Sequence, residues 1–206
     1  MNTRDYLISE SLKLFLRKSF KDVTLEEILK ITGLSKGAFY YYFKSKEQLF
    51  LEIIDTYFSY MVLYDFESYS KSNLRQFYLD HIRDLEKAVS QFELEKDSLA
   101  GGEGPNINFF YPIFDALRLV PAFSEKFRLA RQNEIRCWSE AVGRARKSGE
   151  ISSTMSDEQI ALIFIFTGNS IGLQLIMENC PVDKMPSAYL QFWDNFYASL
   201  KTNKMP

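Results

Sequence analysis

Residues 24–50 combine the side-chain types that hydrogen-bond to DNA phosphates and approach base edges. Lys36, Lys44 and Lys46 supply positive charge, and three consecutive tyrosines at positions 40–42 supply hydroxyl donors. A surface helix gains little from adjacent tyrosines unless they contact a partner. The alternative is an aromatic-rich helical hairpin without such a partner. The combination favours a surface that contacts nucleic acid.

Helix-capping residues predict how this segment folds. Thr24 with Glu27, and Ser45 with Gln48, have the spacing of capping boxes, in which each side chain binds backbone N–H groups at a helix start. Ser35 is placed to cap a short helix between them. These positions predict three successive helices separated by short turns.

The turn and the faces of the middle helix predict a helix-turn-helix. Gly33 permits the positive φ that ends one helix before the next begins. Phe39 and Phe43 lie four apart and should face the core, while small Gly37 and Ala38 let the opposite face approach base edges. The predicted DNA-binding residues are Thr24, Lys36, Gly37, Ala38, Tyr40, Tyr41, Tyr42, Lys44 and Lys46.

The segment from Thr24 to Phe50 resembles the DNA-binding signature of the TetR (tetracycline repressor) family of bacterial regulators. The matching positions are Thr24, Ile28, Gly33, residues 35–37, Phe39-Tyr40, Phe43 and residues 46–49. Thr32 and Glu26 depart from it, at a usual alanine and at a position that is often basic or neutral. The resemblance covers about a quarter of the chain. It implies an all-α homodimeric repressor that a small apolar or amphipathic effector releases from operator DNA.

Composition and charge fit this interpretation. The 206 residues are 46% hydrophobic and carry a net charge of −2, which argues against a non-specific nucleic-acid coat. Residues 1–50 carry a net +3 and the remainder −5, so the basic end is suited to DNA. We expect no signal peptide or membrane span, and a cytoplasmic location. Cys137 and Cys180 have no metal spacing and should be reduced.

Hydrophobic periodicity predicts helices throughout and no strand. We expect an N-terminal helix-turn-helix domain over residues 1–46 and a helical effector-binding and dimerisation domain over residues 47–206. Outside the helix-turn-helix, helices are expected over residues 4–18, 46–68, 74–95, 113–119, 122–147, 156–179 and 186–202, with a loop at 98–112.

The aromatic content of the second domain raises the hypothesis of an effector cavity. Arg131 and Glu134 fall on the apolar face of one helix, where they either pair with each other or orient a ligand. His81, the only histidine, borders an apolar face, where core packing is the alternative to ligand binding. The candidate effector-binding residues are Tyr78, His81, Phe92, Phe109, Phe110, Phe114, Arg131, Glu134, Trp138 and Phe164.

The last two long helices suggest a homodimer interface. Residues 160–177 are apolar almost all round, and a helix of this kind must be covered on two sides. Packing of the same residues within one chain is the alternative. The predicted interface residues are Gly168, Gly172, Tyr189, Trp193, Phe196 and Leu200.

These observations favour a DNA-binding transcriptional regulator, and we expect no cofactor, metal or enzymatic activity. The sequence offers one histidine, no metal-ligand cluster and no phosphate loop, since residues 101–104 lack the required lysine. Two alternatives stay open. One is an effector-independent architectural or cell-division factor that binds DNA. The other is a helical small-molecule carrier that no longer binds DNA.

Overall fold

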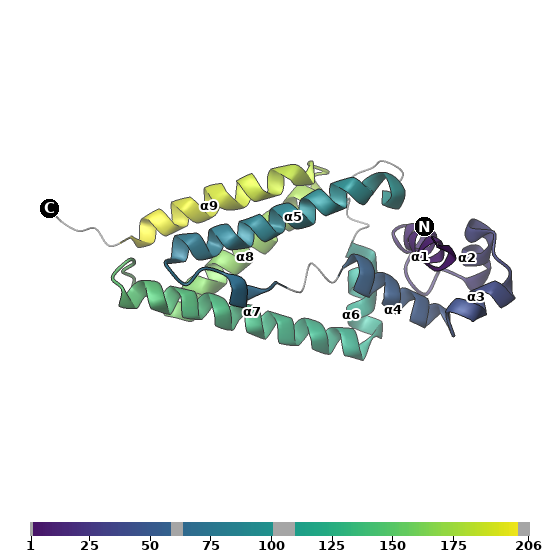
Figure 1. The fold of residues 1–206 in the computed structure, drawn as a ribbon. Helices are drawn as coiled ribbons and strands as arrows, with labels where there is room; N and C mark the ends of the chain where they lie inside the picture. The colour runs from purple at the N-terminus through teal and green to yellow at the C-terminus, as the bar shows by residue number, and fades with distance from the viewer. Residues whose placement is uncertain (1, 59–63, 101–109, 202–206) are drawn as a thin grey trace. The chain divides into compact units, whose positions relative to one another are not determined.

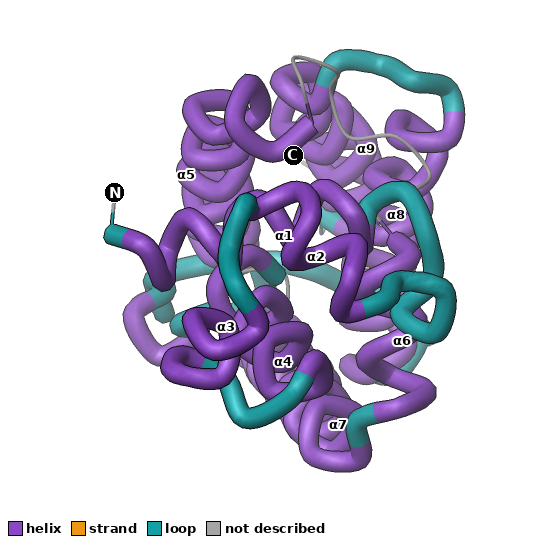
Figure 2. Tube along the Cα trace, turned by 90° about the vertical axis from the view of Figure 1, so that its right-hand side faces the viewer, coloured by secondary structure: helices purple, strands orange, loops and turns teal. Residues whose placement is uncertain are grey.

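The computed structural model describes residues 2–58, 64–100 and 110–201, with the backbone alone over 91–100. The fold is all-α, as predicted: among the described residues, the only β pairing is an isolated bridge between Ile151 and Lys201. The helices are drawn in Figures 1 and 2. They are α1 (Thr3–Phe15), α2 (Leu25–Thr32), α3 (Lys36–Tyr42), α4 (Lys46–Tyr57), α5 (Leu74–Ala100), α6 (Phe110–Leu119), α7 (Pro121–Lys147), α8 (Asp157–Met177) and α9 (Met185–Leu200), with 3-10 turns η2 (Phe66–Ser68) and η4 (Val182–Lys184).

Two predicted boundaries are wrong. The helix expected over 46–68 ends at Tyr57, because Phe58 leaves helical geometry at φ −122° and buries its ring. The loop expected over 98–112 overlaps two helices, since α5 continues to Ala100 and α6 begins at Phe110. Pro112 lies in the first turn of α6, where a helix tolerates proline because the missing N–H has no intrahelical acceptor.

The chain forms two compact units, residues 1–62 with 92–127 and residues 63–91 with 128–206. We call them the N-terminal unit and the C-terminal unit. The N-terminal unit contains α1–α4 and α6 around one apolar core that includes Leu7, Ile28 and Phe50. This division differs from the expected functional boundary at residue 46, which stays a prediction.

The core of the C-terminal unit is built from aromatic rings on α5, α7, α8 and α9. The Trp138 ring centroid lies 5.2 Å from that of Trp193 and 5.1 Å from that of Phe77. Tyr78 donates its hydroxyl to Asp194 on α9 at 2.5 Å, which ties α5 to α9. Of the described helices, α8 is long and apolar enough to cross a membrane by length and composition. That test alone is weak, because core helices of water-soluble proteins also pass it.

Candidate DNA-binding surface

The predicted helix-turn-helix is formed by α2, α3 and the turn between them. Thr24 and Glu27 make both bonds of the capping box, with Thr24 N–H donating to the Glu27 carboxylate at 2.9 Å and Glu27 N–H donating to Thr24 Oγ1 at 3.2 Å. Gly33 ends α2 at φ +68°, a left-handed conformation that favours glycine. Ser35 Oγ accepts from Ala38 N–H at 3.2 Å and starts α3. Local capping therefore fixes the sharp change of direction between the two helices.

The orientation of α3 is confirmed. Phe39 and Phe43 are buried in the core of the N-terminal unit, with Ile28 of α2. On the opposite side, Tyr41 is 81% exposed and Tyr40 is 48% exposed. Among the other predicted DNA-binding residues, Thr24, Lys36, Gly37 and Lys44 are exposed, while Ala38 and Tyr42 are half-buried.

The exposed face of α3 has small residues at its start and aromatic residues after them. A Cβ added to Gly37 would find only Ser35 Oγ within 4 Å, at 3.9 Å, so a partner can approach the backbone there. The Tyr41 and Tyr42 rings meet edge to face with centroids 4.9 Å apart. Small residues beside phenolic donors suit a helix that enters a DNA groove.

Acidic groups near this surface are partly neutralised. Glu27 forms an ion pair with Lys18 as well as its capping bonds. The Lys18 ammonium, followed by the Thr24 backbone N–H, lowers the pKa of Glu27 to about 2. Glu26 is exposed beside it. Thr32, which stands where the family pattern usually has alanine, is buried and satisfies its hydroxyl by donating to the Ile28 carbonyl at 2.7 Å.

The comparisons with known proteins agree with this geometry. Residues 7–53 match the family model described as bacterial regulatory proteins, tetR family. The chain is 42% identical over 55 residues to the HTH-type transcriptional regulator QacR of Staphylococcus aureus (strain Mu50 / ATCC 700699), a match covering 27% of this chain and 29% of QacR. It is 28% identical over 101 residues to IcaR of Staphylococcus epidermidis, the biofilm operon icaADBC HTH-type negative transcriptional regulator, covering 46% and 54% of the two chains. The chain thus matches about a third to a half of these relatives' lengths.

Solved structures extend the likeness in fold to nearly the whole chain. NalD, the secondary repressor of the MexAB-OprM multidrug efflux pump in Pseudomonas aeruginosa, has a TM-score of 0.60 at 16% identity, covering 98% of this chain and 96% of NalD. A putative transcriptional regulator of the TetR/AcrR family has a TM-score of 0.59 at 17% identity, covering 94% and 99%. Residues 7–53 are therefore similar to the regulatory proteins of the tetR family.

Two details of the helix-turn-helix correct the sequence analysis. The Ser45 capping box is only half formed: Ser45 Oγ accepts from Gln48 N–H, but Gln48 Oε1 accepts from Lys44 N–H at 2.7 Å. Lys46 was expected to be exposed beside DNA and is half-buried. Its ammonium donates to the carbonyl oxygens of Phe20 and Val23, at 2.7 and 2.5 Å. Lys46 therefore holds the fold, because its donors are directed at backbone acceptors.

The candidate effector residues do not share one compact unit. Tyr78, His81, Trp138 and Phe164 meet in the aromatic core of the C-terminal unit, where all four are buried. Phe110 and Phe114 lie on α6 of the N-terminal unit, and Phe114 is 60% exposed. The Phe92 side chain and Phe109 lie outside the described residues.

The polar candidates divide into a satisfied pair and two unpaired atoms. Arg131 and Glu134 pair with each other at 2.6 Å, and Arg131 lies over the Phe166 ring at 5.2 Å. By contrast, His81 Nδ1 and Trp138 Nε1 are buried and have no hydrogen-bond partner within the described part of the chain. Burial lowers the pKa of His81 to about 4, so its imidazole is neutral at pH 7. Buried polar atoms without partners are rare, so these two mark a candidate binding position.

The residues predicted for the dimer interface pack mostly within one chain. A Cβ on Gly168 would lie 2.9 Å from Tyr189 Cε2 and 3.0 Å from Trp193 Cζ2, so the absent side chain lets α9 approach α8. A Cβ on Gly172 would lie 3.0 Å from Tyr189 Oη. Leu200 is also buried, and Phe196 is half-buried beside Phe164, with ring centroids 5.0 Å apart. The buried members of the set therefore contact α8 and α9 of their own chain, and their place in a dimer interface stays a prediction.

The sequence analysis missed the apolar residues that α8 and α9 leave exposed. Phe166, Leu173 and Met177 are spaced seven and four apart on α8, and are 56%, 42% and 55% exposed. On α9, Phe192 is 57% exposed. The signal was present in the all-round apolarity of residues 160–177. The sequence alone did not show which side α9 covers.

Proposed function

We propose that this chain is a sequence-specific DNA-binding transcriptional regulator, a cytoplasmic repressor that binds a palindromic operator. The observation that carries the proposal is the exposed face of α3, with Tyr41, Gly37 and Lys36 turned outward from a helix-turn-helix whose other face is buried. IcaR is named a negative regulator and NalD a repressor, which supports the direction of regulation.

Recovery of bound genomic DNA tests this proposal. The purified protein is mixed with fragments of its source genome, and the retained fragments are sequenced. We expect an enriched motif of two inverted half-sites, with centres about one helical turn or a small multiple apart. Retention without enrichment of any motif would contradict sequence-specific recognition. No retention at all would favour the carrier alternative.

We further propose a homodimer, because a two-fold protein matches a palindromic site. Its interface is assigned to the exposed apolar residues Phe166, Leu173, Met177 and Phe192. Phe166, Leu173 and Met177 are exposed together on one face of α8. On the surface of a monomer, exposed large apolar side chains are normally isolated. The buried glycines are unsuitable positions for testing the interface, because an arginine at Gly172 would meet Tyr189 and disrupt the unit itself.

A small apolar or aromatic effector is proposed to bind in the C-terminal unit and release DNA. The support is the pair of unpaired atoms, His81 Nδ1 and Trp138 Nε1, within an aromatic cluster. The ring centroids of these residues are 5.7 Å apart, so both atoms belong to neighbouring side chains of the same cluster. Trp138 Nε1–H requires an acceptor, such as a carbonyl or hydroxyl oxygen.

Tryptophan emission tests the effector proposal. Candidate aromatic compounds are titrated into the wild type and into Trp138→Phe, which leaves Trp193 as the background emitter. We expect a saturable change in the wild type, a weaker one in the variant, and mutual weakening of effector and DNA binding by the same factor. Compounds that bind without altering DNA affinity would contradict effector release. They would favour the effector-independent DNA-binding factor.

A further inference from the structure

The peptide of Phe20, between α1 and α2, is held on both sides by charged side chains. Its N–H donates to Asp115 Oδ2 at 2.6 Å, and its carbonyl oxygen accepts from Lys46 Nζ at 2.7 Å. Asp115 belongs to α6 and is 95 residues away in sequence. Both bonds are charge-assisted and therefore stronger than bonds between neutral groups. Because both bonds are made to the backbone of Phe20, the residue type at this position gives no sequence signal for them.

The Phe20 side chain adds a second set of contacts at the same point. Its ring centroid lies 4.8 Å from that of Phe50 on α4 and 6.0 Å from that of Phe15 on α1. The Lys46 ammonium lies 4.3 Å from the Phe20 ring centroid. Phe20 therefore contacts α1, α4 and α6 within the N-terminal unit.

Asp115 is suited to hold this junction. It is 7% exposed, on a helix whose neighbouring residues are largely apolar. Its second oxygen pairs with Arg118 at 2.8 Å, which compensates the charge of the buried carboxylate. The carboxylate is thus paired, oriented and directed at one backbone N–H of the segment that leads into α2.

The same junction also contacts the residue directly before the helix-turn-helix. Lys46 also binds the carbonyl oxygen of Val23, directly before Thr24, the N-cap of α2. The bonds at Phe20 and Val23 thus hold both ends of the short segment before α2. A shift of α6 that carried Asp115 with it would change the geometry of that segment.

We propose that Asp115 is a positioning residue for DNA binding: through the Phe20 peptide, α6 sets the placement of α2 and α3 and thereby the affinity for the operator. Asp115 touches no DNA in this account. The inference rests on the proposed DNA-binding function and adds to it the route by which α6 acts on the DNA-reading helices.

The test compares Asp115→Ala with Arg118→Ala, because both remove the same ion pair but only the first removes the acceptor of Phe20 N–H. With a retained genomic fragment, Asp115→Ala should weaken binding by about tenfold, the size expected for loss of one charge-assisted bond. Arg118→Ala should lie within about twofold of the wild type. Asp115→Asn, which keeps an oxygen acceptor, should be intermediate. A folded Asp115→Ala with wild-type affinity would overturn the proposal.

Hydrogen exchange at the Phe20 amide supplies a readout that needs no DNA. The amide should exchange at least about tenfold faster in Asp115→Ala than in Arg118→Ala, since only the former loses its acceptor. If Asp115→Ala does not fold, the wild type decides: its Phe20 amide must be among the slowest of residues 16–24, and fast exchange overturns the proposal. A wild type that binds no DNA but protects this amide would contradict the proposed function and leave the junction intact.

Discussion

At the scale of single residues, Tyr41 is the strongest candidate for a DNA contact, because it is 81% exposed on α3. We predict that Tyr41→Ala weakens operator binding by about 1–3 kcal/mol, the usual effect of losing a direct contact, without lowering the melting temperature. Tyr111→Ala is the matched control, because Tyr111 is 44% exposed on α6 of the same unit. Fluorescence anisotropy with labelled operator measures both. Equal affinities for the two variants would contradict the assignment of the exposed α3 face to DNA contact.

The Glu27 carboxylate gives a pH-dependent prediction. Its folded pKa is lowered to about 2, mainly by the hydrogen bond from Lys18, so the stabilisation it provides is complete above its ordinary pKa of 4.5. That stabilisation is lost as pH falls from 4.5 towards 2. Urea unfolding from pH 7 to pH 3 should therefore show wild type and Glu27→Gln converging in stability below pH 4.5. A difference that does not change with pH would contradict the ion-pair origin.

Residue-level prediction from sequence succeeded where local chemistry decides. The Thr24 capping box and the outward Tyr41 follow from spacing alone, and both are confirmed. Lys46 illustrates the limit. Its charge indicated DNA, but its partners are carbonyl oxygens more than twenty residues earlier, which no local pattern encodes. Asp115 was missed for the same reason, although a lone carboxylate on an apolar helix was a usable signal.

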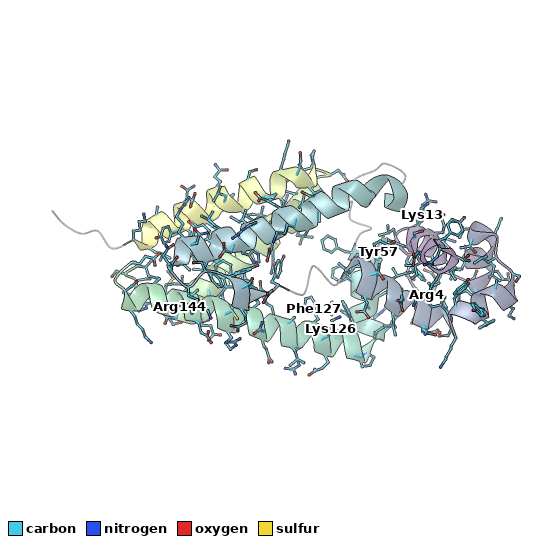
Figure 3. The ribbon with its side chains drawn as sticks, viewed as in Figure 1. Arg4, Lys13, Tyr57, Lys126, Phe127 and Arg144 are labelled. Atoms are coloured by element: carbon cyan, nitrogen blue, oxygen red, sulfur yellow. The ribbon has the colours of Figure 1, made fainter. Side chains whose placement is uncertain are left out.

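At the scale of elements, the long charged side chains show how helices of one unit are connected. Arg4 of α1, labelled in Figure 3, pairs with Glu52 of α4 at 2.8 Å and lies over the Phe43 ring. Lys126 at the start of α7 pairs with Asp55 of α4 at 2.9 Å. Helix existence was predictable from periodicity. Helix ends were not predictable where tertiary contacts determine them. The end of α4 is an example, because the Phe58 ring is buried just beyond it.

The α8–α9 contact gives a prediction at this scale. Gly168→Ala places a methyl group 2.9 Å from the Tyr189 ring and should cost about 1–3 kcal/mol, as overpacking of cores does. Ser170→Ala, an exposed substitution on the same helix, should change stability by less than about 0.5 kcal/mol. Thermal and urea unfolding measure both. A Gly168→Ala variant with wild-type stability would show that α9 is not packed against that glycine.

At the scale of the whole molecule, assembly is the first prediction. Leu173→Glu should convert a dimer into a monomer at micromolar concentration, because a charge at the centre of an apolar interface loses its hydration without a partner. Leu129→Glu, at a 51% exposed leucine of α7, should leave the dimer unchanged. Analytical ultracentrifugation distinguishes the two. A dimeric Leu173→Glu would place the interface elsewhere.

Charge distribution links assembly to DNA. Residues 1–50 carry a net +3, whereas the whole chain carries −2. A basic reading segment beside an acidic remainder favours binding through two defined surfaces of a dimer over general coating of nucleic acid. The fold class followed from composition and periodicity. The exposed side of α8 could not be predicted from composition or periodicity, because it depends on how Tyr189 and Trp193 pack against Gly168.

The most direct test of the DNA-binding account is a salt titration of the wild type with an enriched genomic fragment and with a scrambled fragment of equal length. We predict tighter binding to the enriched fragment by about 10³-fold or more at physiological salt. Affinity for both should fall steeply as salt rises, as counterion release from phosphates requires. Equal affinity for the two fragments at every salt concentration would contradict the claim that α3 reads DNA sequence.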